Sequence, residues 1–195
     1  MKSFKIIFMI FSALLLVCLL NACRPTTEIM SGTPPLYQNQ DQLIHSADAI
    51  IYGEVVKEYE AKKINISAEK SNEKKINDDN MVLFTVFDVR VDEIVKGNLR
   101  TGDVIQVKQL GDKNNAGVKE IVEAGGYFNT KRKYIMFLAN FEHILPGVPY
   151  ETLNPTVGHL EIQDRKIKAN KLFHNTITKN EMIEYLKDKV KMLTS

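Results

Sequence analysis

The chain has 195 residues, of which 26 are basic, 24 are acidic and 44% are hydrophobic. Lys2 and Lys5 are the only charged residues among the first 22, so the formal charge of +2 belongs to the N-terminus and the remainder is balanced, at 24 against 24. A neutral domain is a poor binder of nucleic acid or anionic membrane through its net field. The apolar content, with only 10 Gly and 6 Pro, excludes a wholly disordered or collagen-like chain, and two cysteines exclude a disulfide framework or a four-thiolate metal site.

The N-terminal segment has the pattern of an export signal. Its two lysines precede the 15 residues Ile6 to Leu20, which are all apolar except Ser12. A membrane-spanning helix needs about 20 apolar residues, whereas a shorter run suits the middle of a secretory signal peptide. We therefore expect residues 1–22 to form a signal peptide with a helical apolar part.

The end of this segment, Leu20-Asn21-Ala22-Cys23, resembles the lipobox of bacterial lipoproteins. In that family the signal is cut before the cysteine, and the cysteine thiol receives a diacylglyceryl group. The resemblance implies a mature protein anchored by acylated Cys23 to the extracytoplasmic face of the cell membrane, because two acyl chains attach stably. Cys18 would be discarded, which would leave no free thiol for catalysis. The alternatives are an ordinary cleavable signal and an uncleaved anchor helix.

The next stretch is polar and contains three prolines, Pro25, Pro34 and Pro35. This composition predicts an extended tether. We assign residues 23–36 to the lipidated tether and residues 37–195 to one domain, which the tether would hold away from the membrane.

The domain begins with a predicted short helix over residues 38–47, with Leu43 and Ile44 facing inward. Residues 49–59 are rich in β-branched side chains and predict a strand. Gly53 in the middle of this strand indicates a bulge or the close approach of another backbone.

Residues 61–80 carry many charged and few large apolar side chains, and predict a long, solvated surface loop rather than a partner-binding flap. Residues 81–95 give the strongest strand pattern, apolar on both faces at first and then alternating. This change suits a bent strand in a small barrel. A third strand is expected over residues 104–110, with apolar and polar side chains on opposite faces.

Residues 133–141 are apolar on both faces and predict a strand in the centre of the sheet. Prolines between positions 146 and 155 indicate an irregular segment. Residues 158–162 and 166–169 predict a hairpin. A C-terminal helix is expected over residues 179–193, because Thr178 and Glu181 fit a capping box ahead of an amphipathic stripe.

These elements predict a mainly β fold, a small antiparallel barrel of the OB type with a short N-terminal helix and a C-terminal helix. Residues 46–55 (SADAIIYGEV), the strand that closes on Lys96-Gly97, and Gly125-Gly126 before the apolar strand resemble the netrin-like module, the OB-type barrel of the tissue inhibitors of metalloproteinases. The resemblance covers roughly residues 42–141. The motif KG followed by GD.I.V.Q.G (residues 96–111) is similar to uncharacterised lipoproteins and secreted proteins of Gram-positive bacteria.

The resemblance implies the barrel but not the inhibitory mechanism. Those inhibitors use a free N-terminal cysteine whose amine and carbonyl approach a catalytic zinc, whereas Cys23 would be acylated at the membrane. The disulfides of the inhibitors are also missing.

The chain shows no motif for a nucleophile, a nucleotide or a metal. Four scattered histidines form no close pair, so we expect no metal site and no cofactor. Asp88, Arg90 and Asp92 project from one strand face, where a solvated row with cross-strand charge pairing is the expected arrangement. An acid/base cluster is the alternative, and an extracytoplasmic hydrolase could be assembled from Asp88, Asp92 and His159.

Tyr127 and Phe128 lie next to the basic residues Lys131 and Arg132. We consider these four residues a possible partner-contact surface, with the end of the barrel core as the other reading for the two aromatic rings. A stacking platform for single-stranded nucleic acid is disfavoured by the neutral charge and the expected location.

The sequence therefore predicts a lipid-anchored lipoprotein of a Gram-positive bacterium that acts as a non-enzymatic binding module. Its expected partners are the membrane, through Cys23, and an extracellular or cell-envelope protein, with no nucleic acid. We expect no catalytic residue in it, and the hydrolase is the alternative.

Overall fold

A computed structural model describes residues 36–66, 81–114, 126–143, 145–174 and 177–194, all within one compact unit. The predicted signal peptide, Cys23 and most of the 61–80 loop lie outside these residues. The described elements, in chain order, are α2 (Gln40–Ser46), β1 (Ala49–Glu58), β2 (Lys62–Asn65), β3 (Met81–Lys96), β4 (Val104–Leu110), β5 (Lys133–Ala139), β6 (Tyr150–Thr152), β7 (His159–Gln163), β8 (Lys166–Ile167) and α4 (Lys179–Thr194).

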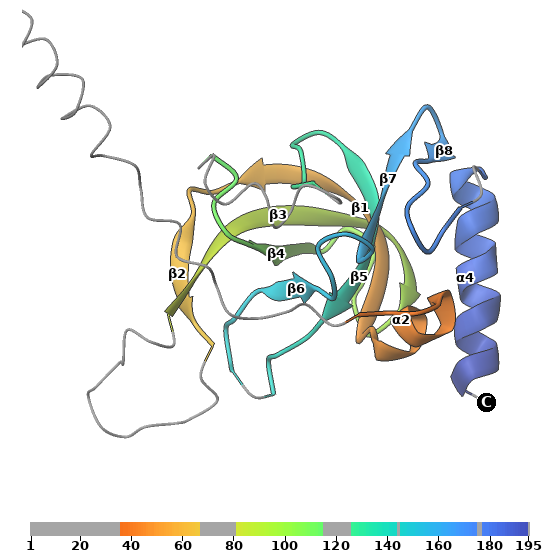
Figure 1. Cartoon of the computed structure of the whole chain (residues 1–195), viewed down its shortest axis with the longest axis horizontal. Helices are drawn as coiled ribbons and strands as arrows, with labels where there is room; N and C mark the ends of the chain where they lie inside the picture. The colour runs from red at the N-terminus through yellow and green to blue at the C-terminus, as the bar shows by residue number, and fades with distance from the viewer. Residues whose placement is uncertain (1–35, 67–80, 115–125, 144, 175–176, 195) are drawn as a thin grey trace, which may run out of the picture. The chain divides into compact units, whose positions relative to one another are not determined.

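Five of these strands close into a barrel (Figure 1). Strands β1, β3, β4, β6 and β5 are hydrogen-bonded in that order, and β5 pairs with β1 to complete the ring. This is the Greek-key arrangement of an OB barrel. The predicted mainly β fold with a C-terminal helix and a short helix is confirmed.

The barrel differs from the prediction in one pairing, because β4 and β6 run parallel while the other neighbours in the ring are antiparallel. The reason is geometric. Strand direction cannot alternate all the way around a closed ring with an odd number of members, so a ring of five strands needs at least one parallel pair. The short β6 supplies it, and the register there joins only Val107 to Tyr150 and Lys108 to Glu151.

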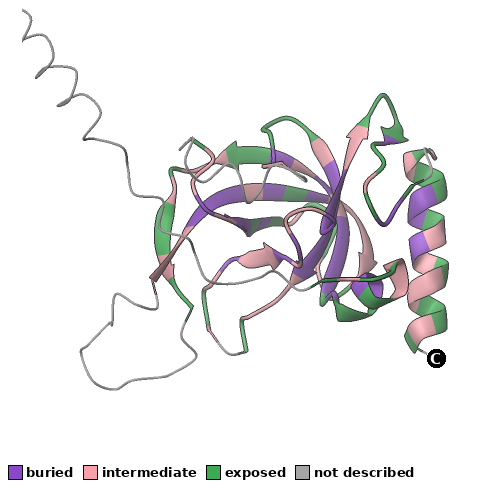
Figure 2. Ribbon diagram, viewed as in Figure 1, coloured by how far each residue is buried: buried purple, intermediate pink, exposed green. Residues whose placement is uncertain are grey.

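Two hydrophobic clusters share the strands β1 and β5. Figure 2 shows buried residues along the barrel strands, β3 and β4 included. Ile51 and Met136 point into the barrel, whereas Ile50 and Phe137 point outward against the helices. Side chains alternate between the two faces of a strand. A strand that faces the barrel core on one side and the helix layer on the other must therefore be apolar at every position, which explains the two-sided pattern of residues 133–141.

The helices lie side by side at one end of the barrel (Figure 1). Leu43 and Ile44 of α2 are buried as predicted, and Lys189 of α4 forms an ion pair with Asp41 at 2.9 Å. The helix α4 extends one residue beyond the predicted 179–193. No helix in the described ranges is long and apolar enough to cross a membrane.

The capping box at the start of α4 is confirmed. The backbone N–H of Thr178 donates to Glu181 Oε2 at 2.8 Å, and the backbone N–H of Glu181 donates to Thr178 Oγ1 at 3.3 Å. The hydrogen bond from the Thr178 backbone lowers the pKa of Glu181. The helix therefore begins at a position that its own sequence specifies.

Two short strands were missed by the sequence patterns. Residues 62–65, placed in a predicted loop, form β2 and pair with residues 81–84 of β3. Residues 150–152, placed in an irregular segment, form β6. Both strands are too short to show a periodic pattern, and their pairing partners are distant in sequence.

The predicted β7–β8 hairpin is confirmed, with Asp164 and Arg165 forming its turn at φ values of 50° and 64°. A two-residue hairpin loop with both central residues at positive φ has the twist that matches the flanking strands. The turn therefore places the Arg165 side chain on the surface beside α4, where the Arg165 carbonyl accepts a hydrogen bond from the Lys179 backbone N–H at 3.0 Å.

Gly53 lies where the backbone of β3 comes close to β1. The β1–β3 register shifts between Tyr52 and Gly53, and a Cβ atom on Gly53 would stand 2.5 Å from the Arg90 carbonyl oxygen and 3.0 Å from Val89 Cγ1. The predicted bulge and close approach are both confirmed. Glycine is needed because the neighbour is backbone, which cannot turn away as a side chain would.

We expect Gly53→Ala to lower the free energy of unfolding by about 1–3 kcal/mol, since the added methyl group must push two paired strands apart. Urea denaturation measures this change. Val56→Ala, at an exposed position of the same strand, is the control and should cost less than about 0.5 kcal/mol. A Gly53→Ala protein as stable as the wild type would contradict the close approach.

Candidate functional site

The described surface contains a groove of about 690 Å³ between β1, the start of β5, the β7–β8 turn and the first turn of α4. A volume of this size suits a small-molecule ligand. Five of the lining residues are cations and no carboxylate is among them. The lining consists of Tyr52, Lys131, Arg132, Lys133, Ile162, Arg165, Thr178, Lys179 and Asn180.

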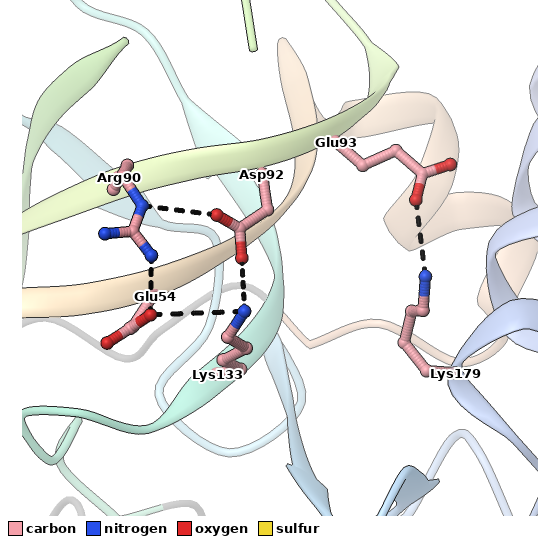
Figure 3. Close-up of polar contacts among 6 residues, drawn as sticks. All are labelled: Glu54, Arg90, Asp92, Glu93, Lys133 and Lys179. Carbon is pink, nitrogen blue, oxygen red and sulfur yellow. Dashed lines mark hydrogen bonds and ion pairs between the residues drawn. The ribbon is translucent and has the colours of Figure 1, made fainter. Parts of the chain in front are cut away.

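Lys133 is neutralised by a network of charges on the neighbouring strands (Figure 3). Its Nζ lies 2.7 Å from Asp92 Oδ2 and 4.0 Å from Glu54 Oε2. Arg90 completes the network, with contacts of 2.7 Å to Glu54 and 3.4 Å to Asp92. The hydrogen bond with Asp92 raises the pKa of Lys133. Cross-strand charge pairing of the β3 row was predicted, and the structure shows it for Arg90 and Asp92.

Lys179 is also paired. Its Nζ lies 3.5 Å from Glu93 Oε2 (Figure 3). Lys187 shares the same carboxylate through Glu93 Oε1 at 3.0 Å. Lys187 also pairs with Glu184 Oε1 at 3.2 Å, so two carboxylates balance the two lysines.

The other three cations of the groove, Lys131, Arg132 and Arg165, form no ion pair with any residue in the part of the chain that the structure describes. Their charges are therefore not offset by neighbouring carboxylates. Three uncompensated cations in one concave surface raise the local concentration of anions.

Two of these three cations are held in a backbone conformation that L residues rarely adopt. Lys131 and Arg165 both have φ of 64°. The Lys131 backbone N–H donates to the Val55 carbonyl at 2.7 Å, and the Val55 N–H donates to the Arg132 carbonyl at 3.0 Å. Positive φ at a residue other than glycine costs roughly 1–2 kcal/mol. Backbone hydrogen bonds at the strand ends and at the hairpin turn hold Lys131 and Arg165 in this conformation.

Tyr52 contributes an aromatic surface to the groove. Lys133 Nζ lies 5.5 Å and Lys179 Nζ lies 5.0 Å from the centre of its ring. Burial raises the pKa of Tyr52 above its ordinary value, at which the hydroxyl already keeps its proton near neutral pH. The groove thus combines an aromatic face with N–H and O–H donors on several sides.

The structure does not bring the four predicted contact residues to one surface. These residues are Tyr127, Phe128, Lys131 and Arg132. Lys131 and Arg132 are exposed and line the groove. Phe128 is 0% exposed and belongs to the barrel core, so its assignment as a contact residue is wrong and the alternative core assignment is confirmed. The ring fills the barrel end because it is apolar and next to other rings.

Tyr127 packs against the same core and its hydroxyl donates to the Leu110 carbonyl at 2.7 Å. Burial raises the pKa of Tyr127 to about 12. The phenol keeps its proton and donates it in the hydrogen bond to the Leu110 carbonyl. The Tyr127 side chain therefore anchors the segment before β5.

The residues considered for a hydrolase have separate partners. Asp88 accepts a hydrogen bond from the Tyr59 hydroxyl at 2.7 Å, and Asp92 belongs to the ion network. His159 is buried, with its ring 5.0 Å from the Phe128 ring and 5.7 Å from the Tyr134 ring. Within the described ranges there is no group of three or more His, Cys, Asp or Glu residues placed to hold a metal ion.

Sequence reasoning missed Tyr52, Arg165 and Lys179 as members of this site. Each comes from a different element, and none stands in a motif. The only local signal is the hairpin turn, which predicts that Arg165 projects from the surface.

A comparison with protein-family models and with curated proteins finds no match to this sequence.

Proposed function

We propose that this protein is a lipoprotein of the cell membrane and acts as a non-enzymatic binding module outside the cytoplasm. The observation that supports binding is the groove, in which Lys131, Arg132 and Arg165 carry uncompensated charge. The anchor rests on the lipobox ending in Cys23. The expected Gram-positive origin and a cell-envelope partner belong to the same proposal.

The non-enzymatic part of the proposal is supported by the separate environments of Asp88, Asp92 and His159. General acid/base catalysis needs its groups within hydrogen-bond reach of one substrate. A groove that offers mainly cations and neutral donors can hold an anion, and binding requires nothing further.

We expect Cys23→Ala to move the protein out of the membrane fraction or to leave it uncleaved, because the thiol that carries the acyl chains is gone. Fractionation of the producing cells and mass spectrometry of the mature N-terminus measure this. Cys18→Ala is the matched control, since it removes a cysteine from the discarded segment and should leave the acylated product unchanged. A mature wild-type N-terminus without a diacylglyceryl group would refute the anchor.

A further inference from the structure

The groove has a charge pattern that its ion pairs do not explain. Carboxylates of β1 and β3 neutralise Lys133, and Glu93 serves Lys179, yet Lys131, Arg132 and Arg165 face the same space without a carboxylate partner in the described ranges. Like charges held close together destabilise the free protein. An anion that enters the groove removes this repulsion.

We propose that the groove binds an anion that carries closely spaced phosphate groups, which deepens the proposed function by naming the ligand class. Three uncompensated positive charges match the charge of a diphosphate. Two of them come from arginine, whose planar fork binds phosphate oxygens in pairs, and the third from lysine, which acts as a point charge.

The arrangement of the donors favours phosphate over carboxylate. The three unpaired cations come from two separate places, the segment before β5 and the β7–β8 turn, and the paired Lys179 adds a cation from the first turn of α4. Thr178 and Asn180 add neutral polar groups. A tetrahedral phosphate accepts hydrogen bonds from several sides, whereas a planar carboxylate accepts them in one plane.

The side chains carry this site, and the helix terminus does not. The capping box already uses the carboxylate of Glu181 to satisfy the backbone N–H of Thr178. The backbone N–H of Lys179 is used by the Arg165 carbonyl. The site therefore depends on the three unpaired cations, two of which are fixed by backbone hydrogen bonds at positive φ.

The test uses the full-length protein in detergent and measures binding of inorganic pyrophosphate by calorimetry. The double variant Lys131→Asn and Arg165→Asn removes two charges without harming the fold, because asparagine tolerates positive φ better than lysine or arginine. Hydrogen bonds to charged groups are strong, so we expect this variant to bind pyrophosphate at least about tenfold more weakly. The control Lys62→Gln and Lys63→Gln removes two exposed charges from β2 and should bind as the wild type does.

Two further probes identify the ligand. Glycerol 3-phosphate carries the headgroup chemistry of a phospholipid, and citrate carries three carboxylates. Binding of pyrophosphate alone supports the proposal, whereas equal binding of glycerol 3-phosphate, which carries a single phosphate, would contradict the need for closely spaced phosphate groups. Equal binding of citrate, absence of binding to both phosphates, or full affinity in the asparagine variant would overturn the proposal. Calorimetry in detergent does not depend on acylation, so this result and the outcome of Cys23→Ala are independent.

Discussion

Replacing Phe128 with alanine should lower the free energy of unfolding by about 3–5 kcal/mol, the range expected when a buried aromatic ring is removed from a core. The ring is 0% exposed. Its centre lies 4.9 Å from the Tyr134 ring and 5.4 Å from the Phe87 ring, with the Phe87 contact edge to face. Such ring pairs stabilise the folded protein by more than their buried area alone accounts for. In the alanine variant the neighbouring rings would border a cavity and lose their contacts with Phe128.

This measurement separates the two assignments that the sequence allowed for Phe128. A partner-contact residue at the surface would tolerate alanine with a change of less than about 0.5 kcal/mol. Tyr127→Phe is the neighbouring control, because it removes only the hydroxyl that donates to the Leu110 carbonyl, and it should cost about 1 kcal/mol. Urea denaturation of the three proteins would contradict the structure if Phe128→Ala were the milder change.

The second large effect is expected at the buried ion pair between Lys108 of β4 and Glu151 of β6. The Lys108 side chain is 2% exposed and that of Glu151 is 31% exposed, and Lys108 Nζ lies 4.0 Å from the centre of the Phe84 ring. Glu151→Gln leaves a positive charge inside without its counter-ion. We expect a loss of about 2–4 kcal/mol, because an unpaired buried charge is strongly destabilising.

Lys108→Met should cost less than about 1 kcal/mol, although it breaks the same ion pair. Methionine keeps an apolar side chain against the Phe84 ring, and the partly exposed Glu151 carboxylate can be hydrated. The protein that carries both Lys108→Met and Glu151→Gln should therefore be more stable than the protein that carries Glu151→Gln alone. Denaturation curves in which Lys108→Met is the more damaging of the two would refute this account of the pair.

An exposed ion pair provides the comparison. Lys168 and Glu161 lie 3.8 Å apart, with the Lys168 side chain 69% exposed. Glu161→Gln should change the free energy of unfolding by no more than about 1 kcal/mol, because solvent screens the pair. The contrast isolates burial as the cause of the effect at Glu151.

Lys108 also shows why burial could not be predicted at this strand. Its alternation with Ile105 and Val107 places it on the outer face of the barrel, as the pattern predicts. That face is covered at Lys108 because Glu151 of β6 pairs with its Nζ and the Phe84 and Phe141 rings lie 4.0 Å and 5.2 Å from it. The sequence of β4 contains no information on β6, which lies about 40 residues further along the chain.

Elements whose signal is local were predicted well. The strand at residues 81–95, the helix with its Thr178 capping box and the need for glycine at position 53 follow from side-chain period, capping chemistry and the absence of a Cβ atom. These properties act within a few residues, so neighbouring positions carry all the necessary information. The closed mainly β barrel follows from the same patterns taken together.

The groove and the parallel β4–β6 pair could not be predicted from local sequence patterns. Closure of five strands requires a parallel pair, and chain folding selects which strands form it. The cations at positions 131, 165 and 179 meet only because a strand end, a hairpin turn and a helix start come together. Electrostatic coupling depends on distance in space, and the spacing of these residues along the chain does not encode that distance.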